Sequence, residues 1–307
     1  MIDWPWESPQ ATRDGLSARL RNRYPQNELR LRQVEVAFRR LLVRLECADP
    51  GRWIVKGGVA LLLRLDPNRT SDDIDLVYGD AAGEHALAVE ALERAFAVDP
   101  ADFFTFEFAV PVAEGVGELE DDTFSIRVRA RIGISEWVSF GVDLARPAED
   151  TPSELLKSAP SLTGLEAVDA LPHLYALPLP RQLAEKICAM FERHGASDSH
   201  STRARDLIDV AMIAKQVDGI LGDALDDDVR SEERRRIQRG SLPEALPRAF
   251  ALSDAQSEDW RKRWSRATRG GPLTFDEALL VAVEFLTPVL AGDVRGRAWS
   301  RDHQAWK

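Results

Sequence analysis

Two neighbouring segments between residues 124 and 144 alternate strictly between apolar and polar residues. In the first segment the apolar positions are Phe124, Ile126, Val128, Ala130 and Ile132, and the positions between them hold Ser125, Arg127, Arg129 and Arg131. In the second segment the apolar positions are Val138, Phe140, Val142 and Leu144, and those between them hold Ser139, Gly141 and Asp143. A period of two sends alternate side chains to opposite faces of a β-sheet. We therefore predict two long strands with one buried face and one polar face.

Two carboxylates stand one residue apart at the start of a shorter apolar segment upstream. The segment from Ile74 to Tyr78 has strand character, so Asp73 and Asp75 are expected to project to one face of a sheet. Adjacent carboxylates repel each other unless a cation lies between them, and Mg²⁺ is the cation that we expect. Acidic pairs at strand ends also occur as solvated turns, and that alternative stays open.

A glycine pair precedes the acids. The mostly apolar residues 59 to 65 predict a helix that begins at Gly57 and Gly58, whose unpaired backbone N–H groups can face a phosphate. A Gly-Gly dipeptide is otherwise most often a plain turn. Because Arg69, Thr70 and Ser71 add a basic group and two hydroxyls just before the acids, the combination favours a phosphate-and-metal site.

The order of these motifs resembles that of a known family. Lys56-Gly57-Gly58 followed by Arg69-x-Ser71-x-Asp73-Ile74-Asp75 is similar to the nucleotidyltransferase toxins of the AbiEii/AbiGii type, which include the MenT-like toxins, within the polymerase β-like superfamily. Two later blocks extend the resemblance from residue 52 to about residue 215: Leu183-Ala184-Glu185-Lys186 and Arg203-x-Arg205-Asp206-Leu207-Ile208-Asp209. The first block is common among nucleotidyltransferases, whereas the ordered combination of all three is more specific to this family.

The resemblance implies a set of metal and nucleotide ligands. Asp73 and Asp75 would coordinate two Mg²⁺ ions, and a third carboxylate helps to hold the catalytic metal in that superfamily. Asp143 is our candidate for this third ligand, because pairing of the two long strands would place it on the polar face; the alternative is a strand-edge aspartate before a loop. The residues implied to bind the nucleoside triphosphate are Gly57, Gly58, Arg69, Ser71 and Lys186.

Lys186 lies on the apolar stripe of a predicted helix. The other members of the stripe are Leu183, Ile187, Met190 and Phe191. A lysine at such a position either extends its ammonium group to the surface or is held in a cleft by an anion. The family block favours a lysine that binds the triphosphate.

A second helix is predicted from Arg203 to Lys215. Asp206 borders its apolar stripe, whereas Asp209 is expected to point away and to form a surface pair with Arg205, four residues earlier. We therefore expect Asp206 rather than Asp209 to join Lys186 and the strand acids as a catalytic residue. A structural clasp between an arginine and Asp206 remains the alternative.

Basic residues form two further candidate surfaces. The arginines of the first alternating segment could hold triphosphate or RNA phosphates, or could be a solvated face that balances Glu107 and Glu118. A second set of basic residues, some of them interleaved with Trp260 and Trp264, suits an RNA backbone and a stacked base. Its members are Arg234, Arg235, Arg236, Arg239, Arg248, Arg261, Lys262 and Arg263. The alternative is a set of helices that pack their tryptophans inward.

The composition limits the compartment and the partners. The chain has 307 residues, no apolar run long enough to cross a bilayer, and no signal-peptide pattern at its start, so we expect a cytoplasmic protein with no membrane partner. A net charge of −11 argues against indiscriminate nucleic-acid binding but is compatible with a local basic surface. Cys47 and Cys188 are expected to be unrelated reduced thiols.

We expect an α+β fold in two domains. Residues 1–150 would form a polymerase β-like nucleotidyltransferase domain, with a mixed sheet flanked by helices such as the packed helix predicted from Glu28 to Cys47. A proline-punctuated segment then leads to a mostly helical domain over residues 151–307, which would contribute Lys186 and Asp206 to the cleft.

The function that we predict is metal-dependent nucleotidyl transfer. The resemblance implies a toxin that adds nucleotides to the 3′ end of tRNA and is encoded beside a cognate antitoxin. One alternative keeps the reaction but transfers the nucleotide to a protein or a small molecule. Another is a non-catalytic module that binds nucleotide or RNA. The sequence indicates neither the nucleotide nor the oligomeric state.

Overall fold

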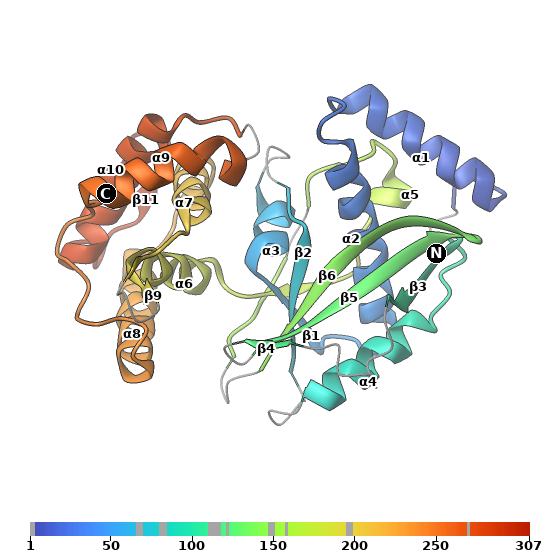
Figure 1. Cartoon of the computed structure of the whole chain (residues 1–307), viewed down its shortest axis with the longest axis horizontal. Coiled ribbons are helices and arrows are strands. Elements are labelled where there is room, and N and C mark those ends of the chain that lie inside the picture. The colour runs from blue at the N-terminus through green and yellow to red at the C-terminus, as the bar shows by residue number, and fades with distance from the viewer. Residues whose placement is uncertain are drawn as a thin grey trace. The chain divides into compact units, whose positions relative to one another are not determined.

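The chain divides into two compact units, Met1–Leu177 and Pro178–Lys307 (Figure 1). The computed structural model describes residues 4–65, 70–79, 85–109, 118–120, 123–146, 151–156, 159–194, 199–268 and 271–307. The division falls later than the boundary after residue 150 that the sequence suggested, because strands β7 (Glu154–Leu155) and β8 (Tyr175–Ala176) belong to the sheet of the N-terminal unit. There β8 pairs in parallel with β1 (Trp53–Lys56).

The N-terminal unit is built on one eight-stranded mixed sheet, with strand order β3-β5-β6-β2-β1-β8-β7 and with β4 also paired to β5. The remaining strands are β2 (Asp73–Tyr78), β3 (Phe104–Phe108), β4 (Glu118–Glu120), β5 (Thr123–Ile132) and β6 (Ser135–Ala145). The two alternating segments are β5 and β6, an antiparallel pair as expected. β2 pairs in parallel with β6, which makes the sheet mixed.

Two helices cover the apolar face of this sheet. They are α2 (Leu29–Ala48) and α4 (His85–Phe96). Phe38 of α2 contacts Phe140 of β6 edge to face, with ring centroids 5.0 Å apart, and Phe96 of α4 stacks on Phe106 of β3. The opposite face of β5, β6 and β2 carries the polar residues of the alternating pattern, which leaves that face free for chemistry.

The N-terminal unit has three other helices. They are α1 (Pro9–Arg23), α3 (Gly57–Arg64) and α5 (Glu166–Asp169). Helix α1 begins at Pro9 under a Ser8 cap and buries Leu16 and Leu20. These two leucines anchor α1, because an isolated helix of this length is only marginally stable in water.

Helix α2 is buried on its polar side as well as along its apolar stripe. Its buried charged residues are Arg32, Glu35, Arg39, Arg40 and Arg44. Arg44 donates to both carboxylate oxygens of Asp102, at 3.0 and 2.6 Å, and Arg39 donates to Glu35 at 3.1 Å. Burial raises the pKa of Glu35 although its arginine partners oppose the shift. Charges this deeply buried are tolerated only because each has an opposite charge or carbonyl beside it.

The C-terminal unit is mostly helical, as expected. Its helices are α6 (Leu179–Phe191), α7 (Ala204–Gln216), α8 (Gly222–Arg239), α9 (Asp254–Thr268) and α10 (Phe275–Ala291), and its short strand pairs are β9 (Arg193–His194) with β10 (Ser199–His200) and β11 (Trp299–Ser300) with β12 (Ala305–Trp306). α7 packs against α6, α9 and α10, so nearly every side of it is covered. Over the described part of the chain, no helix combines the length and the apolar character needed to cross a membrane.

Candidate active site

Four adjacent strands place a row of polar residues across the exposed face of the sheet. Lys56 of β1 pairs with Asp75 of β2, Asp75 pairs with Asp143 of β6, and Asp143 pairs with Ser125 of β5. Asp73, two residues before Asp75, faces the same side and is exposed, whereas Ile74 between them is fully buried. The three carboxylates therefore share one face of the sheet, and strand pairing sets Asp75 and Asp143 side by side.

The glycine pair lies against the second acid. α3 begins at Gly57, whose φ is +57°, and the Gly58 N–H donates to Oδ2 of Asp75 at 3.3 Å. A Cβ atom on Gly57 would overlap the Asp75 carboxylate, so both the positive φ and the close approach require glycine here. The start of α3 thus adjoins the carboxylates, and the positive end of its helix dipole lies beside them.

Ser71 and Arg69 were also predicted to bind the nucleotide, and the structure describes only Ser71. Ser71 is buried, and its Oγ donates to the backbone oxygen of Asp73 at 3.0 Å. This hydrogen bond fixes the backbone at the start of β2, so Ser71 helps to position Asp73 through its backbone. Arg69 lies outside the described residues.

The donor set suits a divalent cation. Ser125 Oγ donates to Oδ1 of Asp143 at 2.7 Å, which orients that carboxylate. Among the described side chains, no three carboxylate, imidazole or thiol groups converge tightly enough to form a metal cage. Mg²⁺ does not need one, because it is usually held by one or two carboxylates together with water and substrate phosphates. The chemistry of Asp73, Asp75 and Asp143 therefore fits the metal that the sequence implied.

Gly141 offers a direct test of the position of Asp73. A Cβ atom on Gly141 would overlap Oδ1 of Asp73, which lies across the neighbouring strand. The Gly141→Ala variant should fold with an unfolding free energy within about 1 kcal/mol of the wild type, because alanine is compatible with a strand and the Asp73 carboxylate can rotate away. The rate of nucleotidyl transfer should fall at least tenfold, because the methyl group displaces the Asp73 carboxylate from its position as a metal ligand.

Gly219→Ala controls for the added methyl group of that variant, because no atom lies within 4 Å of the position that its Cβ would take. Because the φ angle of Gly219 is +71°, alanine at this position is strained and should lower the free energy of unfolding. We expect no effect on the rate of transfer. Initial rates and urea unfolding should be measured on both variants. Full activity in Gly141→Ala would contradict the position that we assign to Asp73.

Lys186 is held by two acids in the C-terminal unit. Its Nζ lies 2.8 Å from Oδ1 of Asp206 and 2.6 Å from Oδ2 of Asp209, and all three side chains are largely buried. The expectation that Asp209 points to solvent is wrong, because the helices around α7 cover that side of it. Arg203 also reaches Asp206, at 3.5 Å. The lysine is therefore a fixed cation rather than one that extends to the surface.

Several residues of the basic cluster proposed for RNA contact in the C-terminal unit form ion pairs within the fold. Its ion pairs include Arg235 and Arg236 with Glu232, Arg261 with Asp276, Lys262 with Glu258, and Arg263 with Asp259. Trp260 and Trp264 are buried and donate to the backbone oxygens of Ser201 and Leu273. The tryptophans pack inward, so they present no stacking surface for a base.

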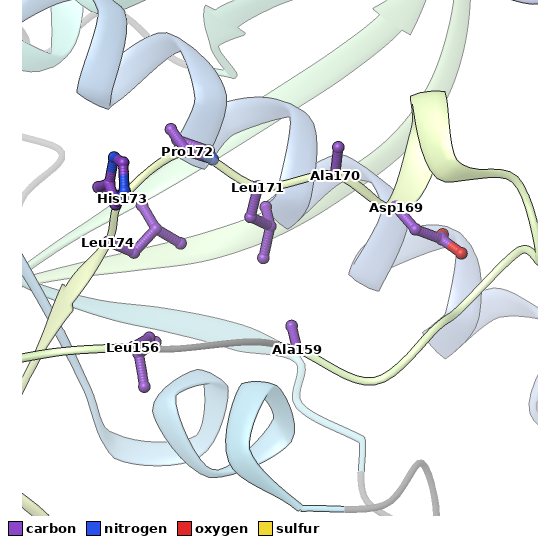
Figure 2. Close-up of a pocket in the computed structure, with 8 residues that line it drawn as sticks. All are labelled: Leu156, Ala159, Asp169, Ala170, Leu171, Pro172, His173 and Leu174. Carbon is purple, nitrogen blue, oxygen red and sulfur yellow. The ribbon is translucent and has the colours of Figure 1, made fainter. Parts of the chain in front are cut away.

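A cavity of about 350 Å³ opens in the N-terminal unit, between the segment around Leu156 and Ala159 and the segment from Asp169 to Leu174 (Figure 2). None of its lining residues is one of the site residues predicted from the sequence. Asp169 is already occupied, since its carboxylate accepts from Ser161, Thr163 and Gly164. The Asp169 carboxylate is therefore committed to the surrounding loop, and His173 is the other titratable residue of the lining.

Acids on adjacent strands of a mixed sheet, next to a glycine-initiated helix, define the nucleotidyltransferase class. The family model described as "Nucleotidyl transferase AbiEii toxin, Type IV TA system" matches residues 40–281, and the chain belongs to this family. The resemblance inferred from the three sequence blocks is thereby confirmed. Family membership makes the protein a nucleotidyltransferase toxin of a type IV toxin–antitoxin system, with a nucleoside triphosphate as substrate and an antitoxin as partner.

A solved structure agrees with the fold. The chain is similar to MenT4, a nucleotidyltransferase toxin from Mycobacterium tuberculosis H37Rv, with a TM-score of 0.55 and 20% sequence identity over 92% of this chain and 99% of MenT4. A putative nucleotidyltransferase from H. pylori matches with a TM-score of 0.48 and 16% identity over 86% of this chain and 95% of its own. No curated protein matches the chain. At 20% identity the likeness to MenT4 establishes the α+β fold alone.

Proposed function

We propose that this protein adds nucleotides to the 3′ end of tRNA in a Mg²⁺-dependent reaction that releases pyrophosphate and stops growth. The observation that carries the proposal is the exposed face on which Asp73, Asp75 and Asp143 adjoin the start of α3. Family membership and the likeness to toxins of this class support it.

The proposed mechanism relies on positioning and charge. Asp73, Asp75 and Asp143 would hold the two Mg²⁺ ions, which would neutralise charge on the attacking and leaving oxygens. The start of α3 at Gly57 and Gly58 attracts the phosphates through the positive end of its helix dipole, and Ser125 keeps Asp143 in place. Phosphoryl transfer needs little covalent help from the protein, so no nucleophilic side chain is required.

We propose that Lys186 neutralises the negative charge that develops on the β- and γ-phosphates during transfer. Its support is the double ion pair with Asp206 and Asp209, which fixes the position of the ammonium group. Asp206 and Asp209 act through the lysine as positioning residues, so the choice between them that the sequence suggested is unnecessary.

The reaction is tested with purified protein, total tRNA, Mg²⁺ and each nucleoside triphosphate in turn. Label in the α-phosphate should reach the tRNA, whereas label in the γ-phosphate should leave as pyrophosphate. Transfer should stop when EDTA removes the metal, and also when periodate destroys the 3′-terminal diol of the tRNA. Label that appears on protein or on a small molecule, and never on RNA, would overturn the proposed acceptor.

A further inference from the structure

The three arginines on the polar face of β5 are not equivalent. Arg129 pairs with Glu107 at 2.9 Å and with Glu136 at 3.0 Å, and Arg131 pairs with Glu107 at 2.9 Å. Hydrogen bonds from Arg131 and Arg129 lower the pKa of Glu107, so this acid stays ionised between them. These two arginines are therefore occupied by the sheet's own acids.

Arg127 is different. It is exposed, and among the described side chains it makes no ion pair; the side chain of Glu118, which the sequence suggested as a balancing acid, lies outside the described residues. Ile126 and Val128 on either side of it are buried, so Arg127 must leave β5 on the polar face. The fold thus presents one exposed guanidinium group on the same face as the acids.

The path from Arg127 to Asp73 crosses a single glycine. Arg127 pairs with Gly141, and Gly141 pairs with Asp73 on the next strand, so the two residues are two strand spacings apart, about 10 Å. No side chain rises from Gly141, and Oδ1 of Asp73 lies over the position where one would begin. The Asp73 carboxylate therefore leans over Gly141 toward the strand that carries Arg127, with no side chain of β6 between the two residues.

Arg127 and the start of α3 lie on opposite sides of the acids. The strand order is β5-β6-β2-β1, with Arg127 on β5 and with Gly57 directly after β1. In-line transfer requires the attacking hydroxyl and the leaving pyrophosphate to lie on opposite sides of the α-phosphorus. With the pyrophosphate at the start of α3, as proposed above, the acceptor would enter from the side of Arg127.

We infer that Arg127 binds a backbone phosphate near the 3′ end of the nucleic-acid acceptor and so positions its terminal hydroxyl over Asp73. This inference rests on the proposed function, because it requires an acceptor that carries phosphates. A guanidinium group suits the task, since its planar donors match phosphate oxygens.

The test compares Arg127→Gln with Arg129→Gln, a matched change two residues along the same strand. In Arg127→Gln the KM for tRNA should rise about tenfold to a hundredfold, as expected for a lost charge-assisted phosphate contact. The KM for the nucleoside triphosphate should not change. The dependence of log affinity for tRNA on log salt concentration should become shallower, with the magnitude of its negative slope reduced by about one. Arg129→Gln should leave all three quantities unchanged, and Arg127→Lys should recover part of the loss.

Modified acceptors identify the phosphate. Acceptor-stem RNAs should be prepared with one linkage at a time replaced by a neutral methylphosphonate, near the 3′ end. One of these replacements should raise the KM of the wild type for the acceptor as much as Arg127→Gln does. The same replacement should not raise the KM of the Arg127→Gln variant any further. Thermal unfolding of both glutamine variants should match the wild type, because both positions are at least partly exposed.

Each failure has a distinct signature. A wild type that labels no RNA at all would contradict the proposed function itself. A wild type that labels tRNA, together with an Arg127→Gln variant of unchanged KM for tRNA, would overturn only the role of Arg127. A rise in the KM for the nucleoside triphosphate alone would also overturn it, because Arg127 would then bind the nucleotide.

Discussion

Replacing Asp75 with asparagine is expected to reduce nucleotidyl transfer by about a thousandfold or more, because a metal clamp supplies several kcal/mol and each 1.4 kcal/mol is a factor of ten in rate. Asp75 sits between Lys56 and Asp143 in the strand register and accepts from the Gly58 N–H. Asparagine has nearly the same shape and can still accept that hydrogen bond. It lacks the charge that holds a divalent cation, so the chemistry should be lost while the fold remains.

The stability of Asp75→Asn should equal or slightly exceed that of the wild type in the absence of metal, since the change removes repulsion between neighbouring carboxylates. Glu136→Gln is the control, because it removes the same charge from the far end of β6, where Glu136 pairs with Arg129. Transfer should be followed with α-labelled nucleotide, and unfolding by circular dichroism. If Asp75→Asn retained more than a tenth of the wild-type rate in Mg²⁺, the assignment of this acid to the metal would be incorrect.

Replacing Lys186 with methionine should destabilise the C-terminal unit by about 3 to 5 kcal/mol, the usual effect of removing one partner from a buried ion pair. Asp206 and Asp209 are 5% and 2% exposed, and both would lose the ammonium group that lies within 2.8 Å of them. Denaturant unfolding measures the loss. It is a large share of the 5 to 15 kcal/mol that holds a typical domain together, so part of the variant should be unfolded near 37 °C.

A triple variant separates the contribution of Lys186 to protein stability from its role in catalysis. Combining Lys186→Met with Asp206→Asn and Asp209→Asn removes the buried charges together, and most of the lost stability should return. Activity should stay absent, because no cation remains for the triphosphate. Lys215→Met, at an exposed site near the end of α7, should change stability by less than about 0.5 kcal/mol. An active triple variant would show that Lys186 serves structure alone.

Much of the catalytic unit could be predicted from local pattern. The alternation between residues 124 and 144 predicted β5 and β6 and their two faces, and the spacing of Asp73 and Asp75 placed both acids on one face. These predictions hold because the side-chain period of a strand is a property of a few consecutive residues. The family blocks then predicted the α+β fold, which the family match and the MenT4 structure confirm.

The pairing of charges could not be predicted in this way. The apolar period of α2 predicted one packed stripe, yet Arg44 of that helix is fully buried against Asp102, 58 residues away. Asp209 looked like a surface residue because its own helix shows only one apolar stripe. Its burial comes from the helices around α7, and its partner Lys186 lies on α6.

The sequence by itself determined the strands, the acid pair, the glycine start of α3 and the family. Only the tertiary structure decided which cation meets which anion: it assigned Arg129 and Arg131 to acids of the sheet, and Lys186 to two aspartates. It also set Arg127 and Asp73 on either side of Gly141. The physical reason is that backbone geometry follows from adjacent residues, whereas an ion pair forms between groups that only folding brings together.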